Sequence, residues 1–423
     1  MKILLRSGWQ TINIGDIGIT PGMLRLIERH LPNAEVTLEL FQENESVRGM
    51  IQRAFPQVRI LSQGFPMPER GEGKDGAAPS EEYVEAMREA DLFLYSSGPI
   101  FSYGRNNFSW DLLMRLAYPC FLAMDSETPW GCYGQSFDRF APPSEYFYRD
   151  FLSRADFLYC RDTDSEKRLR EMGVRPPVLD FAPDATFAFD LRDEAGAAGI
   201  LSEFGLEKGK FLVVIAHGRA GDDLLGKMAQ IIEHWIAATG LPVLLCPEVT
   251  HNLTQHREKL LPRIAPKARK LVHSLDRFWL PDEAATLYRE AGALFSGEMH
   301  SVILALAAGT PAVLFRLQAT GDAADALAYG YEAGEHIMSD GLKGRMMSDL
   351  GLDDWLVYHS ERSQAGEVAS RLINIIENPA ATSQTMAAFK ARLEILQTET
   401  MQTVAATAGK ALPPAADCVS IPQ

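Results

Sequence analysis

The feature that most constrains the fold is a regular alternation between short apolar runs and longer segments with helical periodicity. Residues 91–95 and 156–160 each have one aspartate followed by a continuous apolar run, residues 211–216 are apolar throughout, and stretches with helical spacing separate such runs along the chain. A short apolar run without alternation is typical of a strand that is buried on both faces. Parallel strands need a crossover between them, which is usually a helix. The sequence therefore predicts an α/β fold built on doubly wound parallel sheets.

One stretch divides the alternation into two halves. Residues 191–210 are charged and contain several Gly and Ala, and a new apolar run begins at Phe211. We place a domain boundary there, and expect a Rossmann-like domain in each half. The predicted units are residues 1–195 (N-terminal domain), 205–380 (C-terminal domain), 381–411 (a C-terminal helix that packs back on either half) and 412–423 (a loose tail).

Two helix starts can be predicted from capping signals. Thr20 is expected to cap the first helix with Pro21 in its first position, which leaves residues 13–18 in a glycine-rich loop. Thr163 and Glu166 have the spacing of a capping box, which predicts that a second helix begins there, and Gly173 is expected to end it.

The charge balance excludes some classes of partner. Fifty-six acidic against forty-one basic residues leave a net charge of -15, which disfavours binding to nucleic acid. We expect an anionic ligand to be held by a few local basic groups. The chain lacks an apolar run long enough to span a membrane, and its scattered cysteines lack metal-ligand spacing. These patterns favour a cytoplasmic protein with no metal site and no integral membrane segment.

His300 is the sharpest candidate for acid–base chemistry. It follows a predicted strand at residues 293–296 and a glycine, in the first turn of a helix predicted for residues 299–308. The positive end of the helix dipole opposes protonation, so we expect a neutral imidazole that accepts a proton or donates a hydrogen bond. A buried histidine that only packs is the alternative interpretation.

Three arginines follow predicted strands. They are Arg161, Arg219 and Arg316. Ligands gather at the carboxyl ends of strands in open α/β sheets, and a guanidinium matches the two oxygens of a carboxylate or phosphate. We expect some of the three to bind an anionic ligand, and at least one to form only a surface ion pair.

Polar residues near two predicted turns are candidates for substrate binding. Asn13, Gly15 and Asp16 precede the predicted first helix, whose positive end suits an anion or a hydroxyl-rich ligand. Gln135 follows a strand predicted for residues 120–124. Turns without a ligand are equally consistent with both patterns.

Taken together, these motifs resemble the polysaccharide pyruvyl transferase family. The matching segments are residues 13–16, 133–136, 155–165, 183–187 and 299–311. The resemblance implies a fold similar to GT-B glycosyltransferases, with two Rossmann-like domains facing each other across a cleft. It implies transfer of a pyruvyl group from phosphoenolpyruvate to two sugar hydroxyls as a ketal, as in exopolysaccharide biosynthesis. It implies no cofactor beyond phosphoenolpyruvate as co-substrate, and a sugar or lipid-linked glycan as acceptor. Peripheral membrane association and the oligomeric state stay open.

The resemblance also assigns roles to individual residues. Arg161 and His300 occupy positions that the family uses in donor binding and catalysis. Glu298 stands where the family has an arginine, and a carboxylate there would repel an anionic donor, so Arg316 or Arg219 would have to supply the missing charge. Two alternatives therefore stay open. One is a GT-B glycosyltransferase that uses a nucleotide-sugar, with Glu298 among its binding groups, and the other is a non-catalytic glycan-binding descendant.

Overall fold

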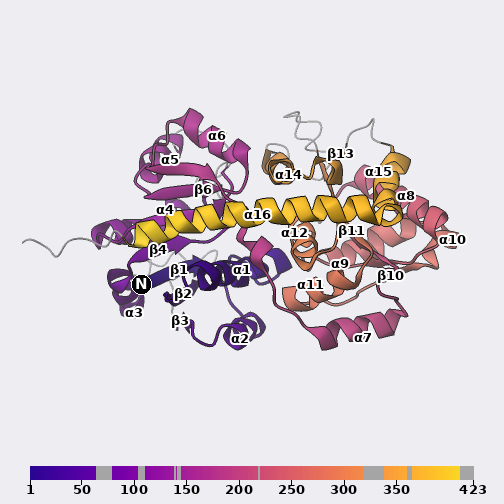
Figure 1. The fold of residues 1–423 in the computed structure, drawn as a ribbon, viewed down its shortest axis with the longest axis horizontal. Helices are drawn as coiled ribbons and strands as arrows, with labels where there is room; N and C mark the ends of the chain where they lie inside the picture. Colours follow the sequence, from indigo (N-terminus) through magenta and orange to yellow (C-terminus); the bar gives the residue numbers. More distant parts are fainter. Residues whose placement is uncertain are drawn as a thin grey trace, which may run out of the picture.

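The computed structural model shows two lobes side by side, and a long C-terminal helix runs along both (Figure 1). It describes residues 1–62, 79–102, 110–137, 140, 144–217, 220–317, 338–359 and 364–409. Each lobe contains one parallel sheet with helices packed around it. In the described part of the chain, no helix combines the length and the apolar character needed to cross a bilayer.

The first lobe contains a seven-stranded sheet in the order β3-β2-β1-β4-β5-β6-β7. Its strands are β1 (Lys2–Ser7), β2 (Glu35–Leu40), β3 (Arg59–Ile60), β4 (Leu92–Tyr95), β5 (Trp130–Gln135), β6 (Phe157–Cys160) and β7 (Val178–Phe181). Its helices are α1 (Ile14–His30), α2 (Glu45–Ala54), α3 (Glu81–Glu89), α4 (Trp110–Asp125), α5 (Ser144–Leu152) and α6 (Thr163–Met172), with short turns η1 (Ile100–Ser102) and η2 (Ala185–Ala188).

The second lobe contains a six-stranded sheet in the order β10-β9-β8-β11-β12-β13. Its strands are β8 (Leu212–Ile215), β9 (Val243–Leu245), β10 (Val272–Ser274), β11 (Ala293–Ser296), β12 (Ala312–Leu317) and β13 (Leu356–His359). Its helices are α7 (Glu194–Phe204), α8 (Asp222–Thr239), α9 (Asn252–Gln255), α10 (Pro266–Arg269), α11 (Pro281–Glu290), α12 (Met299–Ala308), α14 (Met338–Asp349) and α15 (Ala365–Glu377), with short turns η3 (His256–Leu260), η4 (Leu261–Arg263) and η5 (Asp353–Trp355). The long helix of Figure 1 is α16 (Pro379–Ala408).

The order of strands determines where a ligand site is expected. In the first sheet the order reverses between β1 and β4, and in the second it reverses between β8 and β11. Such a reversal separates two crossover connections and leaves a crevice outside the carboxyl ends of the strands. Every residue of β4, β6, β8 and β11 is buried, as expected for parallel strands covered on both faces.

The predicted start of the first helix is wrong. Helix α1 begins at Ile14, and the Asn13 side chain caps it by accepting a hydrogen bond of 2.8 Å from the Gly15 amide. Pro21 lies inside the helix. Glycine also allows close packing farther along this helix. A Cβ on Gly22 would lie 2.2 Å from the carbonyl oxygen of Ala185, so only glycine allows α1 to approach η2 this closely.

Two further local predictions need correction. Residues 120–124 belong to helix α4, and the strand follows later as β5, with Gln135 as its last residue. Periodicity alone does not separate a short strand from a segment of a buried helix. Asp162, not Thr163, caps α6, because its carboxylate accepts a hydrogen bond of 2.7 Å from the Ser165 amide. The predicted end of α6 at Gly173 is confirmed, with φ of 90° in the left-handed region.

The C-terminal helix contacts both lobes. Helix α16 packs against α1 of the first lobe and α15 of the second. Phe389 lies in the core of the second lobe, and Met401 and Val404 lie in that of the first. The predicted loose tail at residues 412–423 lies outside the described residues.

Candidate functional site

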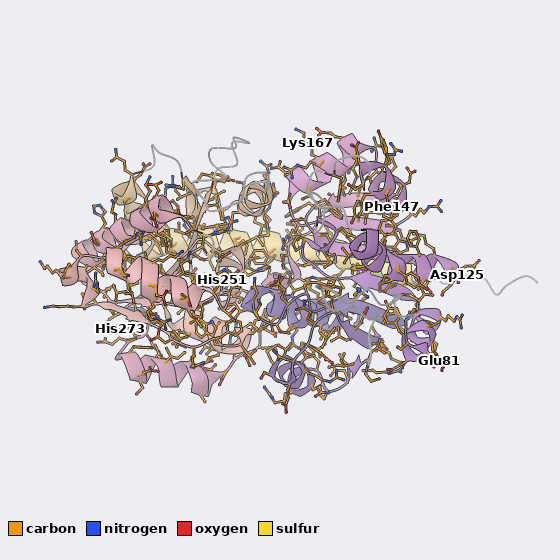
Figure 2. The ribbon with its side chains drawn as sticks, turned by 180° about the vertical axis from the view of Figure 1, so that it is seen from behind. Glu81, Asp125, Phe147, Lys167, His251 and His273 are labelled. Atoms are coloured by element: carbon orange, nitrogen blue, oxygen red, sulfur yellow. The ribbon has the colours of Figure 1, made fainter. Side chains whose placement is uncertain are left out.

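The lobes meet where the start of α1 packs against the start of α12. A Cβ on Gly15 would lie 2.1 Å from Cγ of His300, so the absence of a side chain at Gly15 lets α1 sit directly on the imidazole. Figure 2 labels His251, which lies near the junction of the lobes, whereas Phe147 and His273 lie farther out on the first and second lobes. The first turns of α1 and α12 are therefore in direct contact at the junction of the lobes.

His300 lies between two buried carboxylates. Its Nε2 is 3.8 Å from Oδ2 of Asp184, and its Nδ1 is 3.7 Å from Oε1 of Glu248. Burial by itself would lower the pKa of His300, but its interactions with Asp184 and Glu248 outweigh burial and raise that pKa to about 9. The expected neutral imidazole is therefore wrong. The helix dipole acts as about half a charge, whereas two full carboxylates face the ring.

Asp184 connects His300 to Arg161. Its Oδ2 accepts a hydrogen bond of 2.7 Å from the Arg161 guanidinium, and its Oδ1 accepts one of 2.9 Å from the Thr186 amide at the start of η2. Burial would raise the pKa of Asp184, but His300 and Arg161 hold it well below its usual range. Asp184 is thus an ionised carboxylate with a cation on each side.

Arg161 is part of a buried network rather than a surface ion pair. Its side chain is 2% exposed, and its Nε donates a hydrogen bond of 2.7 Å to the Ser136 hydroxyl. That hydroxyl donates in turn to Asp162 at 2.9 Å, and Ser165 donates to the same carboxylate oxygen at 2.8 Å. Burial raises the pKa of Asp162 to about 6. The network therefore extends from the start of α6 through Arg161 to His300.

Glu248 completes the surroundings of His300. It follows β9, and its Oε2 accepts a hydrogen bond of 2.6 Å from the Ser301 amide in the first turn of α12. Its backbone carbonyl accepts one of 2.9 Å from the Ile14 amide of α1. Burial would raise the pKa of Glu248, but His300 and Ser301 lower it. Glu248 was not selected from the sequence, although its place just beyond the apolar residues of β9 was a usable signal.

The other residues predicted on the first lobe lie close to this site, and two of them hold main chain in place. Asn13 caps α1 and pairs with Val249 in an isolated antiparallel bridge between the lobes. Asp16 lies buried in the first turn of α1. Gln135 is fully buried and binds main chain at both ends of its amide, donating to the Ser96 carbonyl and accepting from the Ile100 amide. This arrangement does not favour Gln135 as a ligand-binding group.

The remaining predicted residues belong to the second lobe. Arg316 on β12 is buried and donates to the carbonyl of Gly297, the residue that links β11 to the start of α12. Glu298 is buried at the N-terminus of α12, where its backbone amide donates to the Ser296 hydroxyl at 2.8 Å. Arg219 lies outside the described residues.

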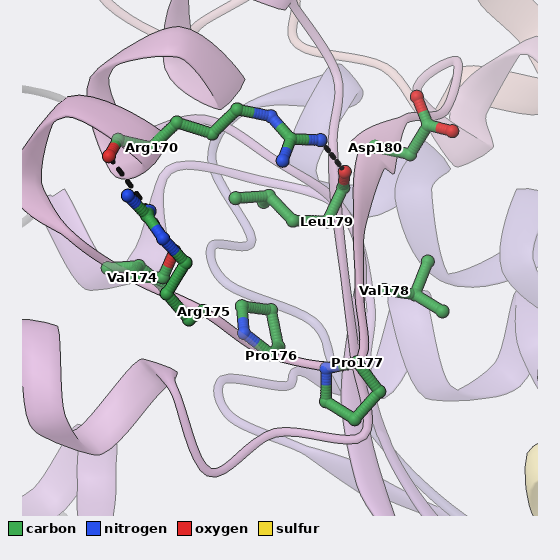
Figure 3. Close-up of a pocket in the computed structure, with 8 residues that line it drawn as sticks. All are labelled: Arg170, Val174, Arg175, Pro176, Pro177, Val178, Leu179 and Asp180. Carbon is green, nitrogen blue, oxygen red and sulfur yellow. Dashed lines mark hydrogen bonds between the residues drawn. The ribbon is translucent and has the colours of Figure 1, made fainter.

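A surface hollow lies elsewhere on the first lobe (Figure 3). It has a volume of about 280 Å³ and is lined by residues between the end of α6 and the strand β7. Both of its arginines bind main chain: Arg170 donates to the Leu179 carbonyl, and Arg175 donates to the Arg170 carbonyl at 2.9 Å. The hollow is at the amino end of β7, whereas the His300 network gathers at the carboxyl ends of strands. We therefore place the candidate site at His300.

Comparison with known families assigns the chain. The family model for polysaccharide pyruvyl transferase matches residues 13–318, a range that contains the whole network around His300. This chain belongs to the polysaccharide pyruvyl transferase family. The resemblance inferred from the sequence motifs is thereby confirmed. No curated protein is significantly similar to the sequence.

Three solved structures with similar folds are distant from this chain in sequence. The UDP-GlcNAc 2-epimerase of Neisseria meningitidis has a TM-score of 0.56 at 12% identity, covering 96% of this chain and 100% of that one. Anabaena HepE in complex with UDP and glucose has a TM-score of 0.54 at 14% identity, covering 97% and 99%. A UDP-glucosyltransferase from Polygonum tinctorium has a TM-score of 0.55 at 10% identity, covering 97% and 98%. These likenesses confirm the expected GT-B-like α/β fold of this pyruvyl transferase family member.

Proposed function

We propose that this family member transfers a pyruvyl group from phosphoenolpyruvate to two hydroxyls of a sugar or lipid-linked glycan. The product is a cyclic ketal, and inorganic phosphate leaves. Membership of the family supports the class of reaction. The single observation that carries the proposal is the position of His300 between Asp184 and Glu248, which keeps an imidazolium at the junction of the lobes.

The proposed reaction needs an acid at its first step. A proton moves to the methylene carbon of the enol, which becomes a methyl group, and positive charge develops on the neighbouring carbon. One sugar hydroxyl adds to that carbon, phosphate leaves, and the second hydroxyl closes the ketal. The two hydroxyl protons balance the proton delivered to carbon and the one taken by phosphate. We assign the first proton to the His300 imidazolium, because a positioned general acid accelerates such a transfer by about 10²- to 10⁴-fold.

The other groups would hold His300 and the substrates. Arg161 is bound to Asp184 and Ser136, so its proposed role is to keep Asp184 ionised beside the imidazole and to add positive charge near the donor. Asn13 and Asp16 at the start of α1 remain our candidates for orienting acceptor hydroxyls. Arg316 and Arg219 remain candidates for the donor side, and Glu298 would bind the donor in the alternative that uses a nucleotide-sugar.

A direct assay tests the proposal. The protein is incubated with phosphoenolpyruvate and a panel of saccharide acceptors, and phosphate release and the mass of the product are measured. We expect phosphate and a pyruvylated saccharide in equal amounts. His300→Ala should reduce turnover by about 10²-fold or more. His273→Ala, which changes a histidine far out on the second lobe, serves as the matched control.

A second assay separates the alternatives. Thermal shifts are measured with phosphoenolpyruvate and, in parallel, with UDP-, GDP- and CMP-sugars. Stabilisation by phosphoenolpyruvate alone supports the proposal. Stabilisation by a nucleotide-sugar, followed by glycosyl transfer, would replace it with a glycosyltransferase. Saccharide binding without turnover of any donor would identify a binding protein.

A further inference from the structure

We propose that Glu248 is a positioning residue that keeps His300 protonated and fixes its ring between the lobes. This inference rests on the proposed function, in which the His300 imidazolium is the acid. Neither the sequence motifs nor the family resemblance pointed to Glu248. It acts through His300 rather than on the substrate.

The charge balance of the buried network supports this role. In the described part of the chain, Arg161 compensates Asp184 through an ion pair of 2.7 Å, whereas His300 is the basic side chain that pairs with Glu248. If His300 were neutral, the one positive charge of Arg161 would face the two negative charges of Asp184 and Glu248. These buried side chains would then carry a net negative charge. Desolvation makes such a charge costly, and one proton on His300 removes it.

The nearby residues of α1 and the start of α12 do not oppose this balance. Helix α1 presents Gly15, which has no charge. The adjacent Asp16, and Glu298 two residues before His300, are carboxylates, and both are buried. Negative charge on either would favour a protonated ring as well.

The hydrogen bonds of Glu248 hold its carboxylate in place. Oε2 accepts from the Ser301 amide at 2.6 Å, while Oε1 faces Nδ1 of His300 at 3.7 Å. Its backbone amide donates to Oδ1 of Asn252 at 2.9 Å, and its carbonyl accepts from the Ile14 amide. The two carboxylate oxygens therefore contact neighbouring residues of α12, and the backbone is tied to both lobes.

Glu248 is a cleaner target for mutation than Asp184. Removing the Asp184 carboxylate would leave the Arg161 guanidinium buried without its ionic partner, which endangers folding. Glu248→Gln removes the charge but keeps the size and an oxygen that can accept from Ser301. Glu248→Asp keeps the charge but shortens the side chain.

The first measurement is an NMR titration of full-length protein with labelled histidine, without substrate. We expect the His300 signal, identified by its loss in His300→Ala, to titrate near pH 9 in the wild type. In Glu248→Gln its midpoint should fall by more than one pH unit, and in Glu248→Asp it should stay within half a unit of the wild type. An unchanged midpoint in Glu248→Gln would overturn the inference.

The second measurement is the pH profile of turnover with phosphoenolpyruvate. Activity requires the protonated ring, so it is lost as the pH rises through the pKa of His300. For Glu248→Gln we expect the alkaline limb to move with the NMR midpoint, and kcat at pH 8 to fall about tenfold if that midpoint is near 7. The acceptor KM should stay unchanged.

The two measurements distinguish a failure of the proposed function from a failure of the inference about Glu248. A shifted midpoint without any turnover of phosphoenolpyruvate in the wild type would overturn the proposed function and leave the role of Glu248 in setting the charge of His300. Turnover in the wild type with the same alkaline limb in Glu248→Gln would overturn the inference and leave the proposed function. If Glu248→Gln does not fold, the Glu248→Asp titration decides: a midpoint more than one unit below that of the wild type contradicts the inference, because the charge is retained.

Discussion

At the scale of single residues, the site depends on which groups are kept apart from water. His300, Asp184, Arg161 and Glu248 are all buried, yet each faces a group of opposite charge. Buried charges are tolerated in proteins when they are paired and hydrogen-bonded. The network therefore keeps the His300 imidazole protonated at a buried position where an isolated imidazole would be neutral.

Gly15 offers a test at this scale. Gly15→Ala would place a methyl group 2.1 Å from Cγ of His300, so the ring or α1 must move. We expect turnover to fall by at least tenfold, measured as phosphate release. Gly18→Ala in the same helix is the matched control. Its methyl group would lie 3.4 Å from the nearest atom, and replacing a helix glycine by alanine contributes about 0.5–1 kcal/mol of stability. Equal activity of the two variants would contradict the close packing of Gly15 on His300.

The residue scale also shows what the sequence could reveal. His300 and Arg161 were found because each follows an apolar strand, and strand ends can be recognised locally. The protonation of His300 could not be predicted, because Asp184 and Glu248 approach it only in the folded chain. Gly15 was interpreted as part of a loop for the same reason. Its contact with His300 joins two lobes and leaves no signal in the local sequence.

At the scale of elements, the second lobe caps a helix of the first. The Asp349 carboxylate, at the end of α14, accepts from the Thr163 amide and hydroxyl at the start of α6, both at 2.9 Å. Arg345 donates to the Thr163 hydroxyl and to Asp349, also at 2.9 Å. This contact lies next to Arg161 and Asp162 in the sequence, so it fixes the part of α6 from which the buried network begins.

Asp349→Ala should weaken this contact. We expect the free energy of unfolding to fall by about 0.5–2 kcal/mol, the usual effect of losing a helix cap. Urea denaturation measures the change. Asp353→Ala, at an exposed acidic residue nearby in the sequence, should change stability by less than about 0.5 kcal/mol. Equal effects of the two substitutions would show that the cap contributes nothing.

Elements also differ in how well they could be predicted. The alternation of strands and helices was clear because burial on both faces imposes short apolar runs on β4, β6, β8 and β11. The apolar residues 120–124 were assigned to a strand, because a buried helix such as α4 presents a similar run. Helix starts were misplaced where Asn13 and Asp162 cap earlier than the residues that matched a motif.

At the scale of the whole molecule, α16 makes the two lobes interdependent. Its first half contributes Met386, Phe389 and Leu393 to the core of the second lobe. Its second half contributes Met401, Val404 and Ala408 to the core of the first. The two cores therefore share one continuous helix, and we expect the lobes to lose structure together on denaturation.

Met401→Ala tests the contribution of α16 to the first lobe. Met401 is fully buried, and such a truncation costs about 2–5 kcal/mol. We expect a single urea denaturation transition at a lower urea concentration than in the wild type. Tryptophan fluorescence is the probe. Ile395→Ala is the control on the same helix, because Ile395 is 58% exposed. Two separate transitions, or equal effects of both variants, would contradict the shared core.

The path of α16 also has a consequence for how the protein is made. A chain leaves the ribosome from its N-terminus, and domains generally fold in that order during synthesis. Here, Met401 and Val404 belong to the core that contains β1 and β2, although the strands of the second lobe are all translated between them. The first lobe to emerge is therefore completed only after the second has been translated, and until α16 leaves the ribosome the apolar surface of the first lobe needs protection from other nascent chains.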